Sequence, residues 1–221
     1  MRKAYRRLAG RWAWNVVSFA GFQGAEARIR RRTVARLELQ PGDAVLDLAC
    51  GRGSNLPYLE RAVGGQGRIV GVDYSPQMLT GAAELSRRRC WGNVELVEGD
   101  AAEIRYRGEF DAAICTIAMT VIPRWQEALR RMVEAVRPGG RVVVMDGRLG
   151  TGWRRVGNLY ARLFARVVAA DLGREIPAEF RRLLPDGREE TMLFGTYYIL
   201  SARRPAERDQ SRGGEHVQSS R

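Results

Sequence analysis

The sequence has 221 residues, which is long enough for a single domain with a substantial buried core. Its 37 lysine and arginine residues outnumber its 25 aspartate and glutamate residues, for a net charge of +12. No apolar run is long enough to cross a bilayer, and arginines interrupt the N-terminus where a signal peptide needs an apolar core. Three cysteines without C-x-x-C spacing (Cys50, Cys90 and Cys115) are expected to be buried and reduced. We therefore expect a cytoplasmic protein without a metal site.

The first 36 residues carry much of the charge, with ten basic residues against one acid. Apolar residues recur at helical spacing over residues 3–22, and a second helix is predicted over residues 25–37 with Arg28, Arg31 and Arg32 exposed. Basic amphipathic segments favour polyanions or anionic membrane surfaces. We expect residues 1–38 to be basic helices that cap a site and contact the inner face of a membrane. The alternative is that they pack on the rest of the protein with their arginines solvated.

A glycine-rich bend follows the first apolar strand of the chain. The strand, at residues 44–49, contains Asp47 and leads into Gly51 and Gly53, and the strand at residues 68–72 ends at a second acid, Asp73. Glycines allow a sharp turn and the close approach of a ligand, and a carboxylate after the next strand can accept hydrogen bonds from a ribose. The third glycine of the dinucleotide pattern and the Gly-Lys-Ser/Thr of a P-loop are both missing. The bend therefore predicts a nucleoside site without phosphates.

Strands and helices alternate along the middle of the sequence. Further strands are predicted at residues 93–97, 110–115 and 141–146, and helices at 55–63, 76–89, 124–136 and 153–170. Such alternation predicts an α/β domain with a parallel sheet and helices on both faces. We place this domain at residues 39–203, and we expect the polar residues 204–221 to form a disordered tail.

Five motifs in register resemble those of the class I methyltransferases that use S-adenosylmethionine. They are D-L-A-C-G-R-G at residues 47–53, residues 71–79, V-E-G-D-A-A at residues 97–102, residues 110–115 and residues 129–141. The resemblance implies a Rossmann-like, seven-stranded, mostly parallel sheet with an antiparallel last strand. Thr191 to Ala202 would then form the antiparallel pair that closes the sheet.

The resemblance also implies roles for single residues. Gly51 and Gly53 would cradle the methionine portion of S-adenosylmethionine, Asp47 would orient that loop, Asp73 would hold the ribose, and Asp100 would accept from the adenine amino group. Tyr74, Met78 and Ala101 would lie beside the adenine, and Thr116 and Ile117 near the reacting sulfonium. Ala49 would also bind the cofactor. An acid at the start of a strand, Asp111, is interpreted as structural.

Catalysis needs little acid–base chemistry here, because the methyl group of a sulfonium is already activated and holding the nucleophile in line supplies ~7–11 kcal/mol. The single histidine, His216, lies in the polar tail, so we expect no histidine base. Tyr5 is the candidate catalytic residue. Asp146 and Tyr160 are alternatives, although Tyr160 fits a core position on its predicted helix.

The acceptor must be inferred from the flanking segments. Residues 115–123 (C-T-I-A-M-T-V-I-P) and 146–148 are similar to bacterial phosphatidylethanolamine N-methyltransferases and to quinone-biosynthesis C-methyltransferases, with Thr120 where the latter often have a histidine. The leading hypothesis is N-methylation of an amphiphilic amine at the membrane surface, with Arg148, Arg154 and Arg155 pairing with a lipid phosphate. Alternatives are C-methylation of a quinone precursor and methylation of RNA or another small molecule.

Overall fold

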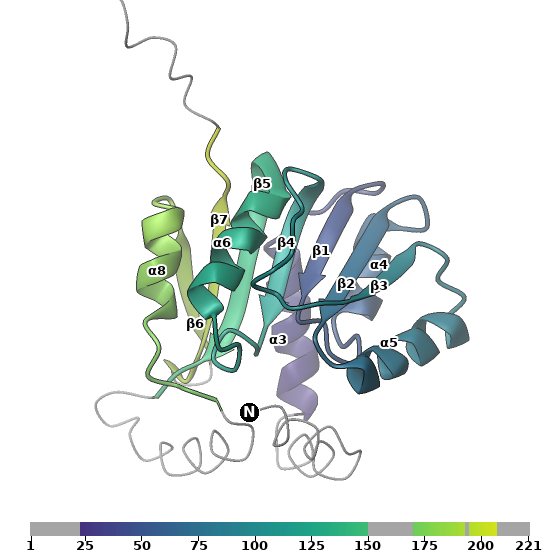
Figure 1. Cartoon of the computed structure of the whole chain (residues 1–221), viewed down its shortest axis with the longest axis horizontal. Helices are drawn as coiled ribbons and strands as arrows, with labels where there is room; N and C mark the ends of the chain where they lie inside the picture. Colours follow the sequence, from purple (N-terminus) through teal and green to yellow (C-terminus); the bar gives the residue numbers. More distant parts are fainter. Residues whose placement is uncertain (1–22, 150–169, 193–194, 207–221) are drawn as a thin grey trace, which may run out of the picture.

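The computed structural model describes residues 23–149, 170–192 and 195–206 (Figure 1). The helices in these ranges are α3 (Gln23–Ala35), α4 (Leu56–Val63), α5 (Pro76–Arg88), α6 (Trp125–Ala135) and α8 (Ile176–Leu183). The strands are β1 (Ala44–Leu48), β2 (Arg68–Asp73), β3 (Val94–Glu98), β4 (Phe110–Thr116), β5 (Val136–Gly147), β6 (Arg188–Met192) and β7 (Tyr197–Arg203). The helix predicted at residues 3–22, most of the one at 153–170 and the polar tail beyond residue 206 lie outside the described residues.

All seven strands form one sheet in the order β3-β2-β1-β4-β5-β7-β6. The first five strands of this order run parallel, whereas β7 runs antiparallel to both β5 and β6. Strand order reverses between β1 and β4, and in open α/β sheets the crevice for ligands lies at that point, outside the carboxyl ends of the strands. The predicted Rossmann-like, mostly parallel sheet with a closing antiparallel pair is confirmed.

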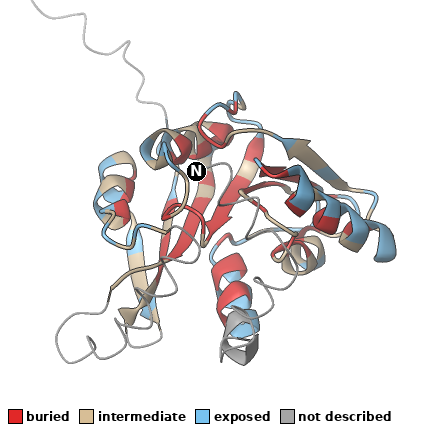
Figure 2. Cartoon of the chain, turned by 60° about the horizontal axis from the view of Figure 1, so that its bottom comes forward, coloured by how far each residue is buried: buried red, intermediate tan, exposed pale blue. Residues whose placement is uncertain are grey.

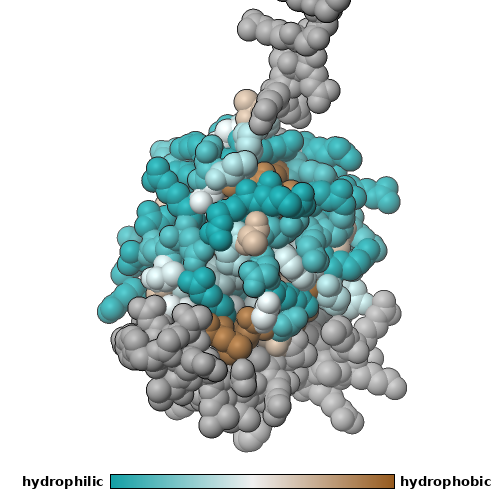
Figure 3. Space-filling model, turned by 90° about the vertical axis from the view of Figure 1, so that its left-hand side faces the viewer, coloured by the Kyte–Doolittle hydropathy of each residue, from teal (hydrophilic) through white to brown (hydrophobic). Residues whose placement is uncertain are grey.

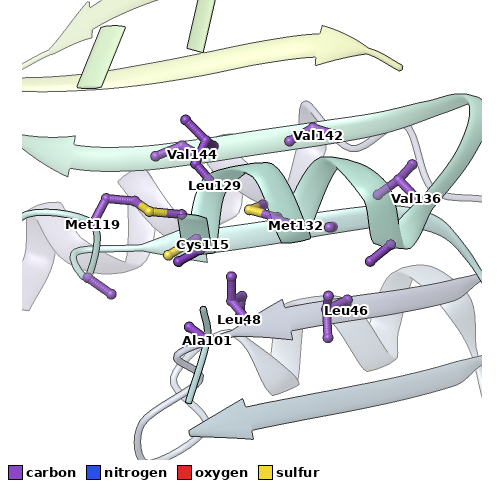
Figure 4. Packing of buried hydrophobic residues seen from close by; sticks show 14 of the residues in the cluster. Leu46, Leu48, Ala101, Cys115, Met119, Leu129, Met132, Val136, Val142 and Val144 are labelled. Atoms are coloured by element: carbon purple, nitrogen blue, oxygen red, sulfur yellow. The ribbon is translucent and has the colours of Figure 1, made fainter. Parts of the chain in front are cut away.

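Two hydrophobic clusters cover the two faces of the sheet. Helix α6 places Leu129 and Met132 one turn apart against Leu46, Val142 and their neighbours on one face, which it shares with α8 (Figure 4). Helices α3, α4 and α5 cover the other face. Figure 2 shows that burial is concentrated in the central strands and on the inward sides of the helices. Both faces are apolar, as a parallel sheet between two helical layers requires.

Helix α3 packs on the sheet through a narrow stripe. Ile29, Val34 and Leu37 are buried, while Arg28, Arg31 and Arg32 are exposed as predicted. No helix within the described ranges is both long and apolar enough to cross a membrane.

Four details of the described chain differ from the sequence predictions. Helix α8 was not predicted; its Pro177 stands in the first turn, where proline is tolerated because the N–H has no helical partner. Strand β5 begins at Val136 and not at residue 141, and β6 begins at Arg188, ahead of the predicted pair. Cys90 is exposed rather than buried.

Candidate functional site

Asp73 connects the end of β2 to the glycine bend after β1. Its Oδ2 accepts from the Gly51 N–H at 2.8 Å and its Oδ1 accepts from the Ser75 N–H at 2.9 Å. Burial raises the pKa of Asp73, and the two N–H donors oppose that rise. Because carboxylate oxygens have more than one lone pair, these bonds orient the group without exhausting its capacity to accept from a ligand.

The two glycines of the bend serve different purposes. Both have left-handed backbones, with φ of +57° at Gly51 and +80° at Gly53. A Cβ on Gly53 would lie 2.6 Å from Leu56 Cδ1, so this glycine is needed for packing within the protein. Among the described residues, a Cβ on Gly51 would meet nothing within 4 Å, so within this part of the chain the bare backbone is uncovered. Gly51 is therefore the position at which a ligand can lie against the main chain.

Two residues without glycine's freedom also have left-handed backbones at this edge. Ala49 has φ of 56° just after β1, and Ile117 has φ of 54° just after β4. The two strands are neighbours, with Leu48 opposite Cys115 in the parallel register. A β-branched residue at positive φ is a clear outlier, and such strain concentrates at functional sites. The strained pair thus lies on both sides of the point where strand order reverses.

A buried polar cluster of Arg30, Asp47, Asn55 and Thr116 connects the ends of β1 and β4. Asp47 is fully buried, and its Oδ1 accepts from Asn55 Nδ2 at 2.9 Å, whereas its Oδ2 has no hydrogen-bond partner among the described residues. Asn55 also donates to Thr116 Oγ1 at 3.1 Å. Burial raises the pKa of Asp47 to about 7, against the lowering effects of Asn55 and the Arg30 guanidinium. Asp47 therefore contacts the start of α4 through Asn55, and Asn55 in turn joins it to Thr116 at the end of β4.

Arg30 and Asn55 belong to this cluster and were missed in the sequence. Arg30 Nη1 donates to Asn55 Oδ1 at 2.8 Å and to Thr116 Oγ1 at 2.9 Å. A signal for Arg30 existed, because it lies three and four residues before Thr33 and Val34, which are buried on the same side of α3. The surrounding run of exposed arginines concealed it.

The predicted adenine side gathers around the loop after β3. Asp100 Oδ1 accepts from the Ala102 N–H at 2.8 Å, and Oδ2 pairs with Arg124 at 2.9 Å. Burial alone would raise the pKa of Asp100, but the Ala102 N–H and the Arg124 guanidinium outweigh it and hold the pKa below its ordinary value. Met78 and Ala101 are buried, while Tyr74 is 51% exposed.

The end of β5 carries a third buried carboxylate, Asp146. It accepts from the Thr120 N–H at 3.0 Å, from the Thr120 hydroxyl at 2.9 Å and from the Gly147 N–H at 2.8 Å. Burial raises the pKa of Asp146 to about 6, opposed by these donors. Tyr198 lies opposite Asp146 in the antiparallel register, and its hydroxyl is buried without a hydrogen-bond partner.

The residues predicted to act on the acceptor fare differently. Arg148 pairs with Glu189 at 2.7 Å, donates to the Gly195 carbonyl at 3.2 Å and lies over the Tyr198 ring. Its guanidinium thus has partners within the protein. Tyr5, Arg154, Arg155 and Tyr160 lie outside the described residues. Asp111 accepts from the Ala44 N–H at 2.8 Å and from Arg137 at 2.7 Å. These contacts lie at the amino ends of β1 and β4, away from the glycine bend, in line with the structural role expected of Asp111.

The sheet order, the bend after β1 and the carboxylate after β2 define a nucleoside-binding α/β domain of the Rossmann-like type. Residues 45–140 match the family model described as "Methyltransferase domain". This region of the chain is therefore similar to methyltransferases, in line with the expected class that uses S-adenosylmethionine.

Curated relatives match this part of the chain. A demethylmenaquinone methyltransferase of Oceanobacillus iheyensis is 30% identical over 142 residues, which are 63% of this chain and 60% of the relative. A protein of the same name from Alkalihalophilus pseudofirmus is 30% identical over 148 residues, covering 62% of this chain and 63% of the relative. The chain therefore spans about three fifths of the length of the curated relatives it matches.

Solved structures share the fold at low sequence identity. A Haemonchus contortus phosphoethanolamine N-methyltransferase 2, in complex with phosphomonomethylethanolamine and S-adenosylhomocysteine, superposes with a TM-score of 0.69 at 16% identity, over 81% of this chain and 53% of that chain. An S-adenosylmethionine-dependent methyltransferase from Aquifex aeolicus gives a TM-score of 0.57 at 16% identity, over 79% of this chain and 89% of that one.

Proposed function

We propose that this chain transfers the methyl group of S-adenosylmethionine to an amphiphilic small molecule. The observation that carries the proposal is the arrangement of Asp73 and Gly51. The buried carboxylate of Asp73 is oriented by the Gly51 N–H. Within the described residues, the space beside the Gly51 backbone is empty of side chains. The ribose hydroxyls of S-adenosylmethionine need a hydrogen-bond acceptor. The methionine portion, which is attached to the ribose, needs protein backbone close enough to bind it. Both requirements fit these residues.

Bound S-adenosylmethionine supplies an electrophilic methyl group on a positively charged sulfur. The residues of this chain then have to bind and orient the cofactor and the acceptor, and they need not transfer protons. Asp73 accepts from the ribose, the Gly51 backbone lines the methionine portion, and the Asp100 loop borders the adenine. Main chain at Ala49 and Ile117 borders the crevice where the acceptor approaches. Alignment of this kind supplies ~7–11 kcal/mol of a barrier.

The curated relatives favour a ring carbon of a quinone precursor as the acceptor, which the sequence analysis held as an alternative. Both relatives described above are named demethylmenaquinone methyltransferases. An apolar acceptor also fits the surface. The face formed by α8 and β6 is mostly hydrophilic, but hydrophobic residues gather at its lower edge, at the end of the molecule where the parallel strands end (Figures 1 and 3).

An amine acceptor is the second candidate, and Asp146 favours it. This carboxylate lies near the end of β5, the strand beside β4, and in its ionised form it would attract an ammonium group. The Haemonchus contortus neighbour was solved with a methylated ethanolamine phosphate. Contact with a membrane through the basic residues 1–22 belongs to this candidate.

One competition assay separates the candidates. The full chain is incubated with S-adenosylmethionine carrying a labelled methyl group, together with a reduced demethylmenaquinone, phosphatidylethanolamine vesicles, phosphoethanolamine and RNA, and the products are identified by mass. We expect label on the quinone. Label on an amine alone supports the second candidate, and label on RNA alone contradicts both.

Binding of the donor is tested independently by calorimetry with S-adenosylhomocysteine, with NAD as the control ligand because the bend lacks the third glycine of a dinucleotide site. Binding of NAD in place of S-adenosylhomocysteine would contradict the whole proposal.

A further inference from the structure

We propose that Arg30 is a positioning residue of the cofactor site, which acts through Asn55 and Thr116 to fix the ends of β1 and β4 in the geometry that binds the methyl donor. The inference rests on the proposed function and adds to it a residue from α3, a helix that lies ahead of the matched residues 45–140 in the chain. In Figure 1, α3 lies behind the sheet at β1 and β4, toward the carboxyl ends of these strands.

The burial of Arg30 is the first observation. Only 6% of its surface is exposed, whereas Arg28, Arg31 and Arg32 on the same helix are exposed. Arginine is almost never buried unless its guanidinium is paired or hydrogen-bonded, because desolvation of the charge is costly. Arg30 Nη1 meets two oxygens, Asn55 Oδ1 at 2.8 Å and Thr116 Oγ1 at 2.9 Å. The guanidinium thus joins two segments of the site that are far apart in the sequence.

The behaviour of Asn55 is the second observation. Asn55 is the N-cap residue of α4, yet its side chain makes no capping hydrogen bond. Asparagine is among the strongest N-cap residues, and a missing cap costs about 1 kcal/mol. The amide instead accepts from Arg30 and donates to Asp47 and Thr116. The start of α4 therefore lacks the stabilisation of a side-chain cap. The Asn55 amide instead forms hydrogen bonds within the buried polar cluster.

The backbone strain above the cluster is the third observation. Thr116 directly precedes Ile117, and Asp47 lies two residues before Ala49; Ile117 and Ala49 are the residues with left-handed backbones at the crevice. A strained backbone conformation persists only where several independent contacts of the surrounding structure hold it in place. Arg30 binds Thr116 directly and reaches Asp47 through Asn55. One guanidinium therefore restrains both strained strand ends, and these line the place of the reacting methyl group.

The test compares Arg30→Gln with two variants of the same helix. Arg31→Gln removes an exposed arginine, and Val34→Ala weakens the packing of α3 without touching the cluster. We expect Arg30→Gln to raise the Kd for S-adenosylhomocysteine about tenfold, the ratio given by the loss of hydrogen bonds from a charged donor. Arg31→Gln should leave the Kd unchanged. Val34→Ala should lower the Tm while leaving the Kd within about twofold of the wild type. Equal effects of Arg30→Gln and Val34→Ala on the Kd would overturn the inference.

Kinetics and a double-mutant cycle give a readout that mere destabilisation would not move. Arg30→Gln should raise the KM for S-adenosylmethionine and leave the KM for the acceptor unchanged. Arg30→Gln and Thr116→Val should be non-additive in the Kd, because each breaks the same contact. Arg30→Lys, which can still donate to Thr116, should recover part of the affinity.

Failure of either proposal is recognised separately. Wild-type protein that binds no S-adenosylhomocysteine contradicts the proposed function. Wild-type binding with an unchanged Kd in a folded Arg30→Gln contradicts the role of Arg30 alone. If Arg30→Gln does not fold, Thr116→Val decides, and a wild-type Kd in that variant overturns the inference.

Discussion

The Gly51 N–H donates to Asp73 Oδ2 at 2.8 Å, so the bend after β1 and the carboxylate after β2 form one unit. Oδ1 of the same carboxylate accepts from the Ser75 N–H, which fixes the direction of the group at the start of α5. A substitution at Asp73 therefore changes two features at once, namely the acceptor that we propose for the ribose and the support of the glycine bend.

We predict that Asp73→Asn weakens the binding of S-adenosylhomocysteine at least about tenfold, because hydrogen bonds to a charged group contribute ~1.5–3 kcal/mol each. Isothermal calorimetry measures the Kd. The control is Glu84→Gln, which removes a carboxylate from the exposed part of α5 and should bind as tightly as the wild type. Unchanged affinity in Asp73→Asn would refute the assignment of the ribose to this residue.

The buried carboxylates give the stability of the protein an unusual dependence on pH. Burial raises the pKa of Asp47 to about 7 and that of Asp146 to about 6, from 3.8 for each when exposed. Between about pH 4 and pH 7 the native state therefore binds more protons than the unfolded state, and the free energy of unfolding falls as the pH rises. Asp100 and Asp111, whose pKa values are lowered, lose stabilising charge only below this window.

We predict that the free energy of unfolding in urea is larger at pH 5.5 than at pH 7.5, by an amount on the order of a few kcal/mol. Asp47→Asn should reduce this slope and raise the stability at pH 7.5, because the amide keeps the acceptor for Asn55 and carries no buried charge. Glu84→Gln should keep the wild-type slope. A variant Asp47→Asn that is as pH-dependent as the wild type would show that the effect has another source.

Much of the fold follows from local patterns in the sequence. The alternation of apolar strands and amphipathic helices predicts the parallel sheet, and the acids Asp47 near the end of β1 and Asp73 at the end of β2, with the glycines between them, mark the proposed cofactor site. These features depend on residues close together in the chain. The aromatic and β-branched residues of β7 likewise indicate a strand irrespective of its partners.

The remaining features depend on partners distant in the sequence. Arg30 is buried because Asn55 and Thr116 meet it from other elements. Glu190 in edge strand β6 pairs with Arg32 of α3 and with Arg36, which directly follows α3, and both partners are far from β6 in the sequence. The partners of Arg148 are also distant, and they give it a role within the protein that its basic neighbourhood did not indicate.

The packing around Gly71, in the middle of β2, leaves no room for a side chain. A Cβ there would lie 2.9 Å from both Cys50 Sγ and Leu96 Cδ2. We predict that Gly71→Ala lowers the free energy of unfolding by ~1–3 kcal/mol, the usual cost of overpacking. Because Cys50 belongs to the glycine bend, the variant should also weaken binding of S-adenosylhomocysteine. Gly65→Ala, whose Cβ would meet nothing within 4 Å, is the control. Equal stability of the two variants in urea would contradict the prediction.

Helix α5 ends in a left-handed turn that Cys90 occupies at a cost. The Trp91 N–H donates to the Ser86 carbonyl at 3.0 Å and the Cys90 N–H to the Arg87 carbonyl at 3.2 Å, the two hydrogen bonds of a Schellman C-cap. Cys90 has φ of 55° and an exposed side chain, so it bears the steric cost of the left-handed backbone without compensating burial. That cost is ~1–2 kcal/mol for an L-residue, and glycine avoids it.

We predict that Cys90→Gly stabilises the protein by about 1 kcal/mol after the extra chain entropy of glycine in the unfolded state is subtracted. The gain should raise the Tm by about 2–4 °C for a domain of this size. Cys90→Ala is the matched control, because it removes the thiol and keeps the Cβ that causes the strain. Both variants are melted in a reducing buffer, so that disulfide formation by the wild type does not enter the comparison. If Cys90→Ala gained as much as Cys90→Gly, the thiol rather than the backbone would be the source of the instability.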